Sequence, residues 1–221
     1  MAYQFQFGSV FAGFDQLLWG AWLTVVLSAA GIALGLALGI LGGWGRAQGP
    51  RWLAWTIAVY VELIRNTPFL VQLFLVFFGL PSLGIRMSAG SAALLTLTIN
   101  TGAYCTEIIR AGIEAVPRGQ IEAGRALGLT RFHVFRFLIL FPALRTVYPA
   151  LASQFTLMML ATSVVSQISA EELTFAANFM QSRTFRSFEI YAVVTVMYLV
   201  LALAFRGFFR GIHWLAFERG R

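Results

Sequence analysis

Few side chains in this 221-residue chain could carry out chemistry on their own. The two histidines, His133 and His213, lie far apart, and the single cysteine, Cys105, lies in an apolar run. A metal-ligand cluster and an intrachain disulfide are therefore not expected. The sequence also has no glycine-rich phosphate-binding motif and no nucleophile beside an evident base. We therefore predict no catalytic residue, no metal site and no cofactor in this chain.

The most informative polar segment runs from Glu114 to Arg145 and has the sequence EAVPRGQIEAGRALGLTRFHVFRFLILFPALR. Strong helix formers from Gln120 to Leu127, bounded by Gly119 and Gly128, predict a helix of about two turns. A second helical run, Phe132 to Leu140, follows it. The small side chains at positions 123, 124 and 126 suit insertion into a groove of a partner. On these grounds alone, docking and a passive loop are equally expected.

Polar side chains within apolar runs are the next candidates, because a charge at the bilayer centre costs about 2.5–3.5 kcal/mol and therefore faces protein or water. Glu107 lies three residues before Arg110, and this spacing favours a structural ion pair over a substrate contact. Glu62 and Arg65 have the same spacing, with the same expectation. Better candidates for a solute path are uncharged side chains that lie deeper in the apolar runs. These are Asn100, Gln154, Thr162 and Ser163. Hydrogen bonding between helices would explain the presence of each about as well.

The elements that position these residues are membrane spans. The chain is 59% hydrophobic and 11% charged, whereas soluble domains carry about 45–50% apolar and about 25% charged residues. A membrane-crossing helix needs roughly 20 apolar residues. Five stretches meet this requirement, at about 19–44, 52–80, 88–109, 144–168 and 190–209, and the second is interrupted at 65–68. We therefore predict an all-α membrane protein with five transmembrane helices.

The arginines predict the orientation of these spans. All 16 basic residues are arginines, against 9 acidic residues, and basic residues beside spans mark the cytoplasmic side. An outside N-terminus leaves 13 of the 16 in cytoplasmic segments, with only Arg86, Arg183 and Arg186 outside. We therefore expect the N-terminus outside, the C-terminus inside and the Glu114–Arg145 segment in the cytoplasm between spans three and four. The positive charge does not indicate a nucleic-acid partner in this setting, and no cleaved signal peptide is expected.

Glycines and prolines predict how the spans pack and begin. Gly31, Gly35, Gly39 and Gly43 recur every four residues along one face of the first span. Small residues at this spacing let helix backbones approach closely in lipid, and packing within the subunit is favoured over a dimer face. Prolines 142 and 149 are expected to open the fourth span, because the first turn of a helix tolerates proline.

Several motifs, in their order along the chain, resemble those of the EAA-loop permeases of ABC importers. The Glu122-Ala123-Gly124 triplet, Gly128 and the apolar run that ends at Pro142 look like the EAA loop. Flanking motifs are similar to those of the polar amino-acid uptake subgroup (histidine/glutamine/arginine-type permeases), over about residues 17–212 in all. These flanking motifs are Tyr60–Pro68 with Leu70-Val71-Gln72, Asn100–Tyr104 with Glu107 and Arg110, and Val116–Gln120.

Three departures from the family pattern are present. Gly124 stands where alanine is usual, at a cost of about 1 kcal/mol of helix propensity. Pro142 comes one residue later than the family spacing, so that a residue added within 138–141 is expected to shift the register at the base of span four. Leu160 stands where related permeases often carry a basic or polar residue.

The resemblance implies one permease domain, residues 1–221, with a core at about 17–212 and a cytoplasmic coupling loop at about 112–142. It implies a multi-pass permease in the bacterial inner membrane, which imports polar or basic amino acids by alternating access. The coupling residues would be Glu122, Ala123, Gly124, Leu127 and Gly128. ATP and Mg would be bound by a pair of cytoplasmic ATP-binding subunits, so that this chain is not expected to be an enzyme.

The resemblance also implies further partners besides the lipid of the membrane. A periplasmic substrate-binding protein would deliver the amino acid to outer loops at about 79–88 and 170–188. Glu171 and Glu172 lie in the second loop, where a solvated face is expected more than a docking role. A second permease chain is implied, and the apolar Leu160 favours a related chain over a second copy of this one.

Two alternatives remain open. The first is a permease of the same superfamily that moves an opine or a sulfur-containing amino acid, because solute selectivity would reside mainly in the binding protein. The second belongs to another class, a membrane sensor or assembly subunit that transports nothing and docks a cytoplasmic partner through the same loop. Substrate-stimulated ATP hydrolysis coupled to uptake separates the two classes.

Overall fold

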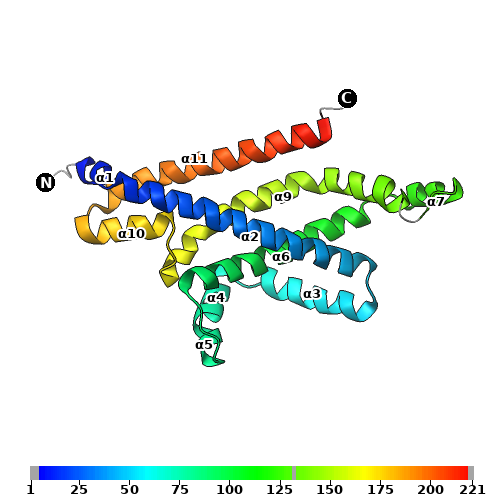
Figure 1. Ribbon diagram of the computed structural model, residues 1–221, viewed down its shortest axis with the longest axis horizontal. Helices are drawn as coiled ribbons and strands as arrows, with labels where there is room; N and C mark the ends of the chain where they lie inside the picture. The colour runs from blue at the N-terminus through cyan, green and yellow to red at the C-terminus, as the bar shows by residue number, and fades with distance from the viewer. Residues whose placement is uncertain (1–4, 131–132, 219–221) are drawn as a thin grey trace. The chain divides into compact units, whose positions relative to one another are not determined.

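The computed structural model describes residues 5–130 and 133–218, without the side chains of Arg118 and Phe135 (Figure 1). Arg131, Arg219 and Arg221, which contribute to the predicted orientation, lie outside the described residues. Every regular element within these ranges is a helix. The expected all-α class is therefore confirmed for this part of the chain.

The helices in chain order include four of more than 20 residues, joined by shorter helices and single helical turns. They are α1 (Gly8–Ala12), α2 (Phe14–Gln48), α3 (Arg51–Arg65), α4 (Phe69–Phe74), η1 (Leu75–Gly79), α5 (Leu80–Ser82), α6 (Ala89–Glu114), α7 (Arg118–Ala126), η2 (Val134–Leu140), α9 (Phe141–Ala161), η3 (Thr162–Ile168), α10 (Leu173–Thr184), α11 (Ser187–His213) and η4 (Trp214–Glu218).

Three helical stretches are long and apolar enough to cross a membrane: 14–48, 136–168 and 187–218. A fourth candidate is a bent pair, Arg51–Arg65 and Phe69–Ser82, with a break between its two arms. The bend falls at the predicted interruption, residues 65–68. Pro68 has no N–H for a continuing helix, and Asn66 ends α3 by donating its N–H to the Glu62 carbonyl oxygen.

The chain forms two compact units. The first comprises Met1–Ile32, Phe69–Leu97 and Thr156–Phe208, and the second comprises Ala33–Pro68, Thr98–Phe155 and Phe209–Arg221. The core of the first unit joins side chains from α1, α2, α10 and α11, because burial of these apolar groups stabilises the packed helices. These side chains are Val10, Leu17, Leu173, Ala177, Met180, Ile190 and Val194.

In the second unit, the glycine face of α2 packs on α6. A Cβ at Gly35 would overlap Thr101, and a Cβ at Gly39 would overlap Cys105. A Cβ at Gly43 would come to 2.8 Å from Ile109. Helix backbones approach this closely only where small residues face the neighbour. The expectation that this face packs within the chain is confirmed, and Cys105 is a buried free thiol.

The start of the fourth span differs from the prediction. A π-helical turn, η2, precedes α9, so that Pro142 lies near the start of α9 but Pro149 lies inside it. The placement of Pro149 in the opening turn was wrong, because the helical stretch begins before residue 144. A π-helix bonds i to i+5 and takes more residues per turn than an α-helix. The register shift expected from the residue added within 138–141 stays a prediction.

The segment expected as an outer loop at about 170–188 contains a helix. α10 runs from Leu173 to Thr184, and Glu172 is its N-cap residue. The carboxylate of Glu172 accepts the Phe175 N–H at 2.7 Å, which satisfies one of the unpaired donors of the first turn. This cap anchors α10 in the core of the first unit.

Candidate functional site

The coupling-loop helix α7 has a defined cap at each end. Pro117 is its N-cap and has an extended backbone, as expected for a residue that starts a helix. At the other end Gly128 adopts a left-handed backbone, with φ +78°. Its N–H donates to the Arg125 carbonyl oxygen (3.0 Å), and the Leu129 N–H donates to the Gly124 carbonyl oxygen (3.1 Å). These two bonds form a Schellman C-cap, for which glycine at this position is preferred.

Gly124 faces the inside of the loop. A Cβ at this position would meet Leu138 of η2 and come to 3.5 Å from both Leu129 and Val134. The glycine that replaces the usual alanine therefore lets α7 pack closely on η2. Gly124 is a buried positioning residue here, so it is not part of the exposed face of α7.

The other predicted coupling residues are exposed. Glu122, Ala123 and Gly128 are open to the surroundings, and Leu127 exposes 81% of its surface. The arrangement offers a partner a compact face of one carboxylate, small residues and one large apolar side chain.

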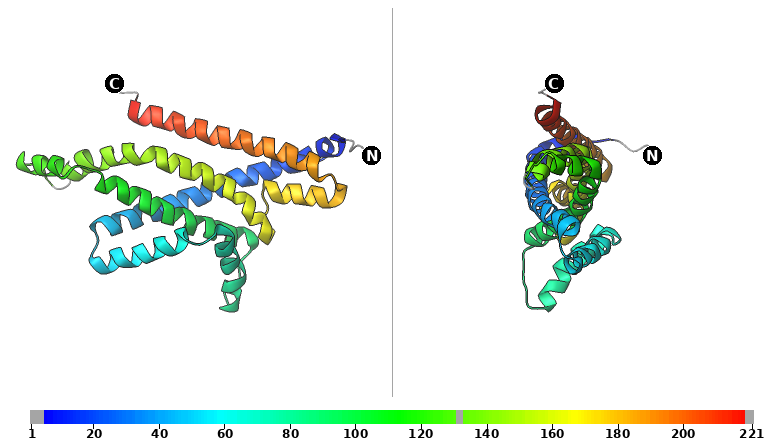
Figure 2. Two further views of the ribbon diagram at one scale, coloured as in Figure 1. Left: turned by 180° about the vertical axis from the view of Figure 1, so that it is seen from behind. Right: turned by 90° about the vertical axis from the view of Figure 1, so that its right-hand side faces the viewer.

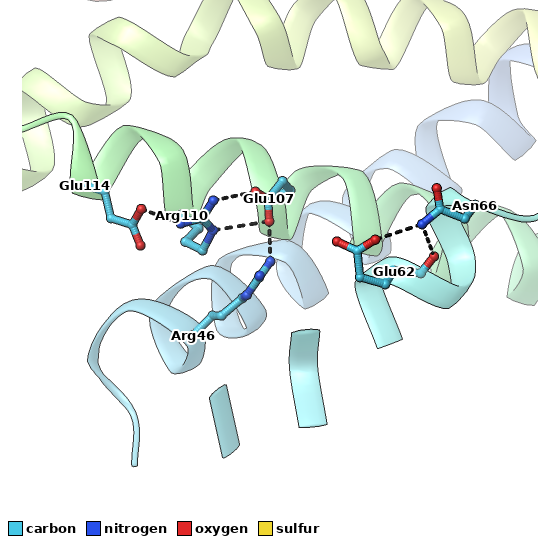
Figure 3. Close-up of polar contacts among 6 residues, drawn as sticks. All are labelled: Arg46, Glu62, Asn66, Glu107, Arg110 and Glu114. Atoms are coloured by element: carbon cyan, nitrogen blue, oxygen red, sulfur yellow. Dashed lines mark hydrogen bonds and ion pairs between the residues drawn. The ribbon is translucent and has the colours of Figure 1, made fainter. Parts of the chain in front are cut away.

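Glu107 joins α6 to α2 through a network of charges (Figure 3). It accepts two bonds from Arg110, at 2.5 Å and 3.2 Å, and forms an ion pair with Arg46 of α2. Arg110 also pairs with Glu114, one turn further along α6. The predicted pairing of Glu107 with Arg110 is confirmed. Arg46 was missed, because it lies far away in the sequence and no local spacing points to it.

Glu62 and Arg65 do not pair as their spacing predicted. Glu62 instead accepts a bond of 2.8 Å from the Asn66 side chain (Figure 3). The guanidinium of Arg65 lies over the ring of Tyr104, 5.4 Å from its centroid. A cation–π contact with a neighbouring helix therefore replaces the expected ion pair within α3.

The predicted path residues are distributed over both units. Asn100 is buried and Gln154 is half-buried, and both belong to the second unit together with Glu107. Thr162 and Ser163 lie in η3 of the first unit. Their hydroxyls donate to the Met159 and Leu160 carbonyl oxygens, at 2.6 Å and 2.8 Å. Each hydroxyl oxygen can still accept a bond.

Glu172 is a buried acid that sequence reasoning assigned to a solvated face. Only 1% of the residue is exposed, and its carboxylate accepts a bond of 2.6 Å from the Tyr198 hydroxyl of α11. α2 contributes as well, since the hydroxyl of Thr24 accepts the Leu173 N–H at 3.1 Å. Burial raises the pKa of Glu172, against the lowering effect of these hydrogen bonds. The expectation was correct for the exposed Glu171 and wrong for Glu172.

The sequence contained a signal for the N-cap role of Glu172, but this signal was ambiguous. Glu172 directly precedes an apolar run that begins at Leu173, which is where an N-cap lies. Glutamate is not among the preferred N-cap residues, so the pattern did not single it out.

Within the described residues no group of three or more histidine, cysteine or acidic side chains is placed to hold a metal ion.

Comparison with known proteins identifies relatives over nearly the whole chain. Residues 31–213 match the family model described as "Binding-protein-dependent transport system inner membrane component". The glutamine transport system permease protein GlnP of Escherichia coli K12 is 37% identical over 203 residues, which cover 90% of this chain and 92% of GlnP. The octopine transport system permease protein OccM of Rhizobium meliloti is 35% identical, over 91% of this chain and 86% of OccM.

A solved structure has the same arrangement of helices. A crystal structure of an amino acid ABC transporter with histidines contains a chain that aligns with a TM-score of 0.89 and 33% identity. The alignment covers 96% of this chain and 99% of that chain. Sequence and fold therefore agree on the same class of membrane protein.

Proposed function

Because this chain belongs to the family of inner-membrane components of binding-protein-dependent transport systems, we propose that it imports a polar or basic amino acid with energy from ATP hydrolysis in a partner. The chain is a multi-pass permease subunit. The observation that carries the proposal is α7, which presents an exposed face while Gly124 and Gly128 fix its position. Glutamine is the first solute to test, because GlnP is named for it.

The proposed topology has five spans: α2, the bent α3–α5 segment, α6, α9 with its flanking turns, and α11. α6 has 26 residues, a length of about 39 Å at 1.5 Å per residue, which is enough to cross the hydrocarbon core. The N-terminus lies outside and the C-terminus inside, as the arginine distribution favours. The whole of residues 1–221 then forms one permease domain.

Coupling would pass through α7. Glu122, Ala123 and Leu127 contact a groove of a cytoplasmic ATP-binding subunit, and Gly128 fixes the end of the helix. ATP and Mg are bound by that subunit pair, which performs the hydrolysis. Closure of the pair moves the spans and opens the path outward, past Asn100, Gln154, Thr162 and Ser163, with Glu107 retained in its ion-pair network.

The second permease is proposed to be a related chain. Leu160 is apolar and 38% exposed, so this chain supplies little polarity at a position where relatives often carry it. A partner with more polar groups would complete the solute path. A periplasmic binding protein delivers the solute to the outer face, which includes the exposed Glu171.

Native mass spectrometry of the complex, isolated through a tag on this chain, tests the assembly. The expected mass contains two ATP-binding subunits, one copy of this chain and one related permease. Two copies of this chain would overturn the heteromeric arrangement and leave the importer. A complex without an ATPase, under conditions where a known importer stays intact, would overturn the importer itself.

A second candidate solute is an opine, which the 35% identity to OccM favours. Uptake into vesicles that contain the complex and its own binding protein distinguishes the two. Glutamine or a basic amino acid should compete for uptake at lower concentration than octopine. The reverse order would assign the system to opines.

A further inference from the structure

The second unit contains an apolar groove near the cytoplasmic ends of its helices. α6 contributes Ile109 and Ile113, and α2 contributes Leu41 and Trp44. The opposite side is formed by η2 and the start of α9, where Leu140 and Leu144 line the groove. All the lining side chains are hydrocarbon apart from the Trp44 indole.

Two glycines create this groove. Gly43 of α2 lies against Ile109, and Gly112 of α6 lies against Val147 of α9. α6 therefore contacts both neighbours closely, while α2 and α9 are held on either side of it. Figure 1 and Figure 2 show the C-terminal half of α2 alongside α6. The groove is the space between α2 and α9 over α6.

Its size and openness fit a lipid chain. The volume is about 340 Å³, more than twice that of an engineered apolar cavity of about 150 Å³ that takes up benzene. Leu41 is 68% exposed and Trp44 is 55% exposed, so the groove opens to the surroundings of the helices. For an inner-membrane protein these surroundings are lipid, and tryptophan is typical of the membrane–water interface.

Charge beside the groove selects the kind of lipid. Arg136 lies on η2 about one turn before Leu140, which lines the groove, and its side chain is exposed. Arg136 lies over the Phe137 ring, and it makes no ion pair within the described part of the chain. The carboxylates of Glu107 and Glu114 are already paired with Arg46 and Arg110. The region near the groove therefore carries an excess of positive charge.

We propose that this groove binds one acyl chain of an anionic phospholipid, with the lipid phosphate held by Arg136. Arginine is well suited to phosphate because its guanidinium donates two parallel hydrogen bonds. An acyl chain needs no hydrogen-bond partner, whereas an extended peptide segment in this groove would leave its backbone polar groups unpaired. The site is independent of the transported solute and lies outside the proposed coupling face.

Photocrosslinking in intact membranes identifies the occupant without weakening the site. A benzophenone amino acid replaces Trp44 in the full complex, because its side chain is closer in size to an indole than to the side chain of leucine. Trp52, an exposed tryptophan of α3 that does not line the groove, serves as the matched control. We expect the Trp44 adduct to be enriched in phosphatidylglycerol relative to the Trp52 adduct. An adduct with a second permease or an ATP-binding subunit, or equal lipid composition at both positions, would overturn the proposal.

Lipid retention measured by native mass spectrometry tests the charges. The complex is exchanged into micelles with equal amounts of phosphatidylglycerol and phosphatidylcholine. Wild type should retain phosphatidylglycerol about fivefold better, since an arginine near an anionic surface contributes about 1 kcal/mol. R136Q should lose this preference, whereas R145Q, at an exposed arginine on the opposite face of α9, should keep it.

Filling the groove gives a second test. L41W should reduce the retention of both lipids, and L34W should not, because only Leu41 lines the groove. Unchanged retention in L41W, or an equal loss in L34W, would contradict the proposed site. Retention of both lipids in equal amounts by wild type would contradict its selectivity for anionic lipids.

Discussion

The carboxylate of Glu172 connects two helices of the first unit. It caps α10 through the Phe175 N–H and accepts the Tyr198 hydroxyl, so that it joins α10 to α11. Thr174 bonds the same hydroxyl at 2.8 Å. Burial raises its pKa above the ordinary value of 4.5. In the pH range just above 4.5, the folded protein therefore binds more protons than the unfolded chain.

The raised pKa of Glu172 predicts how the stability of the folded protein depends on pH. The contribution of Glu172 is greatest below pH 4.5 and is lost as pH rises through its folded pKa. E172Q removes this pH-dependent contribution, while the side-chain oxygen of the glutamine can still cap α10. The melting temperature of wild type should therefore rise, relative to E172Q, as pH is lowered from 7 towards 5. E172A, which also loses the cap, should be less stable by about 1–2 kcal/mol at all pH values. A constant difference between wild type and E172Q would contradict the raised pKa.

At the scale of elements, the contact between α2 and α6 depends on glycines with no room for a side chain. An added Cβ at Gly39 would overlap Cys105 and come to 3.1 Å from its backbone carbon, which cannot move aside. G39A should therefore destabilise the protein by about 1–3 kcal/mol, despite the better helix propensity of alanine.

Gly207 of α11 is the matched control, because nothing lies within 4 Å of an added Cβ there. G207A should raise stability by up to about 1 kcal/mol. Thermal unfolding of the purified variants in detergent measures both changes. Equal effects at the two positions would show that α2 does not pack on α6 as described.

The helices themselves were predictable where periodicity and composition are strong. The short helix around Gln120–Leu127 and the interruption at 65–68 follow from local sequence. α10 was missed because its first residues follow an acidic pair that resembles a solvated loop. The Arg46–Glu107 pair and the Arg65–Tyr104 contact depend on helix packing, which no single-sequence spacing encodes. Among the candidate site residues, the exposure of Glu122 and Leu127 was predictable, but the inward position of Gly124 was not.

At the scale of the whole molecule, the orientation of the chain is directly testable. Cys105 is buried, so the wild type provides a background with little labelling. Ser9 precedes the first span and Thr130 lies in the coupling loop, and both are exposed. In spheroplasts, a membrane-impermeant maleimide should label S9C, and it should label T130C only after permeabilisation. The reverse pattern would contradict an outside N-terminus.

The central claim is that this permease is driven by a partner ATPase through the exposed face of α7. The most direct measurement is amino-acid uptake into proteoliposomes that contain the purified complex, ATP and the binding protein, compared between wild type and E122R. Glu122 is exposed, so E122R should fold and insert into the membrane normally and lose at least about 90% of ATP-dependent uptake, a loss equivalent to about 1.4 kcal/mol or more of coupling. S182R, at an exposed residue of α10, should retain uptake. Wild-type uptake by E122R at equal complex content would contradict the role of α7.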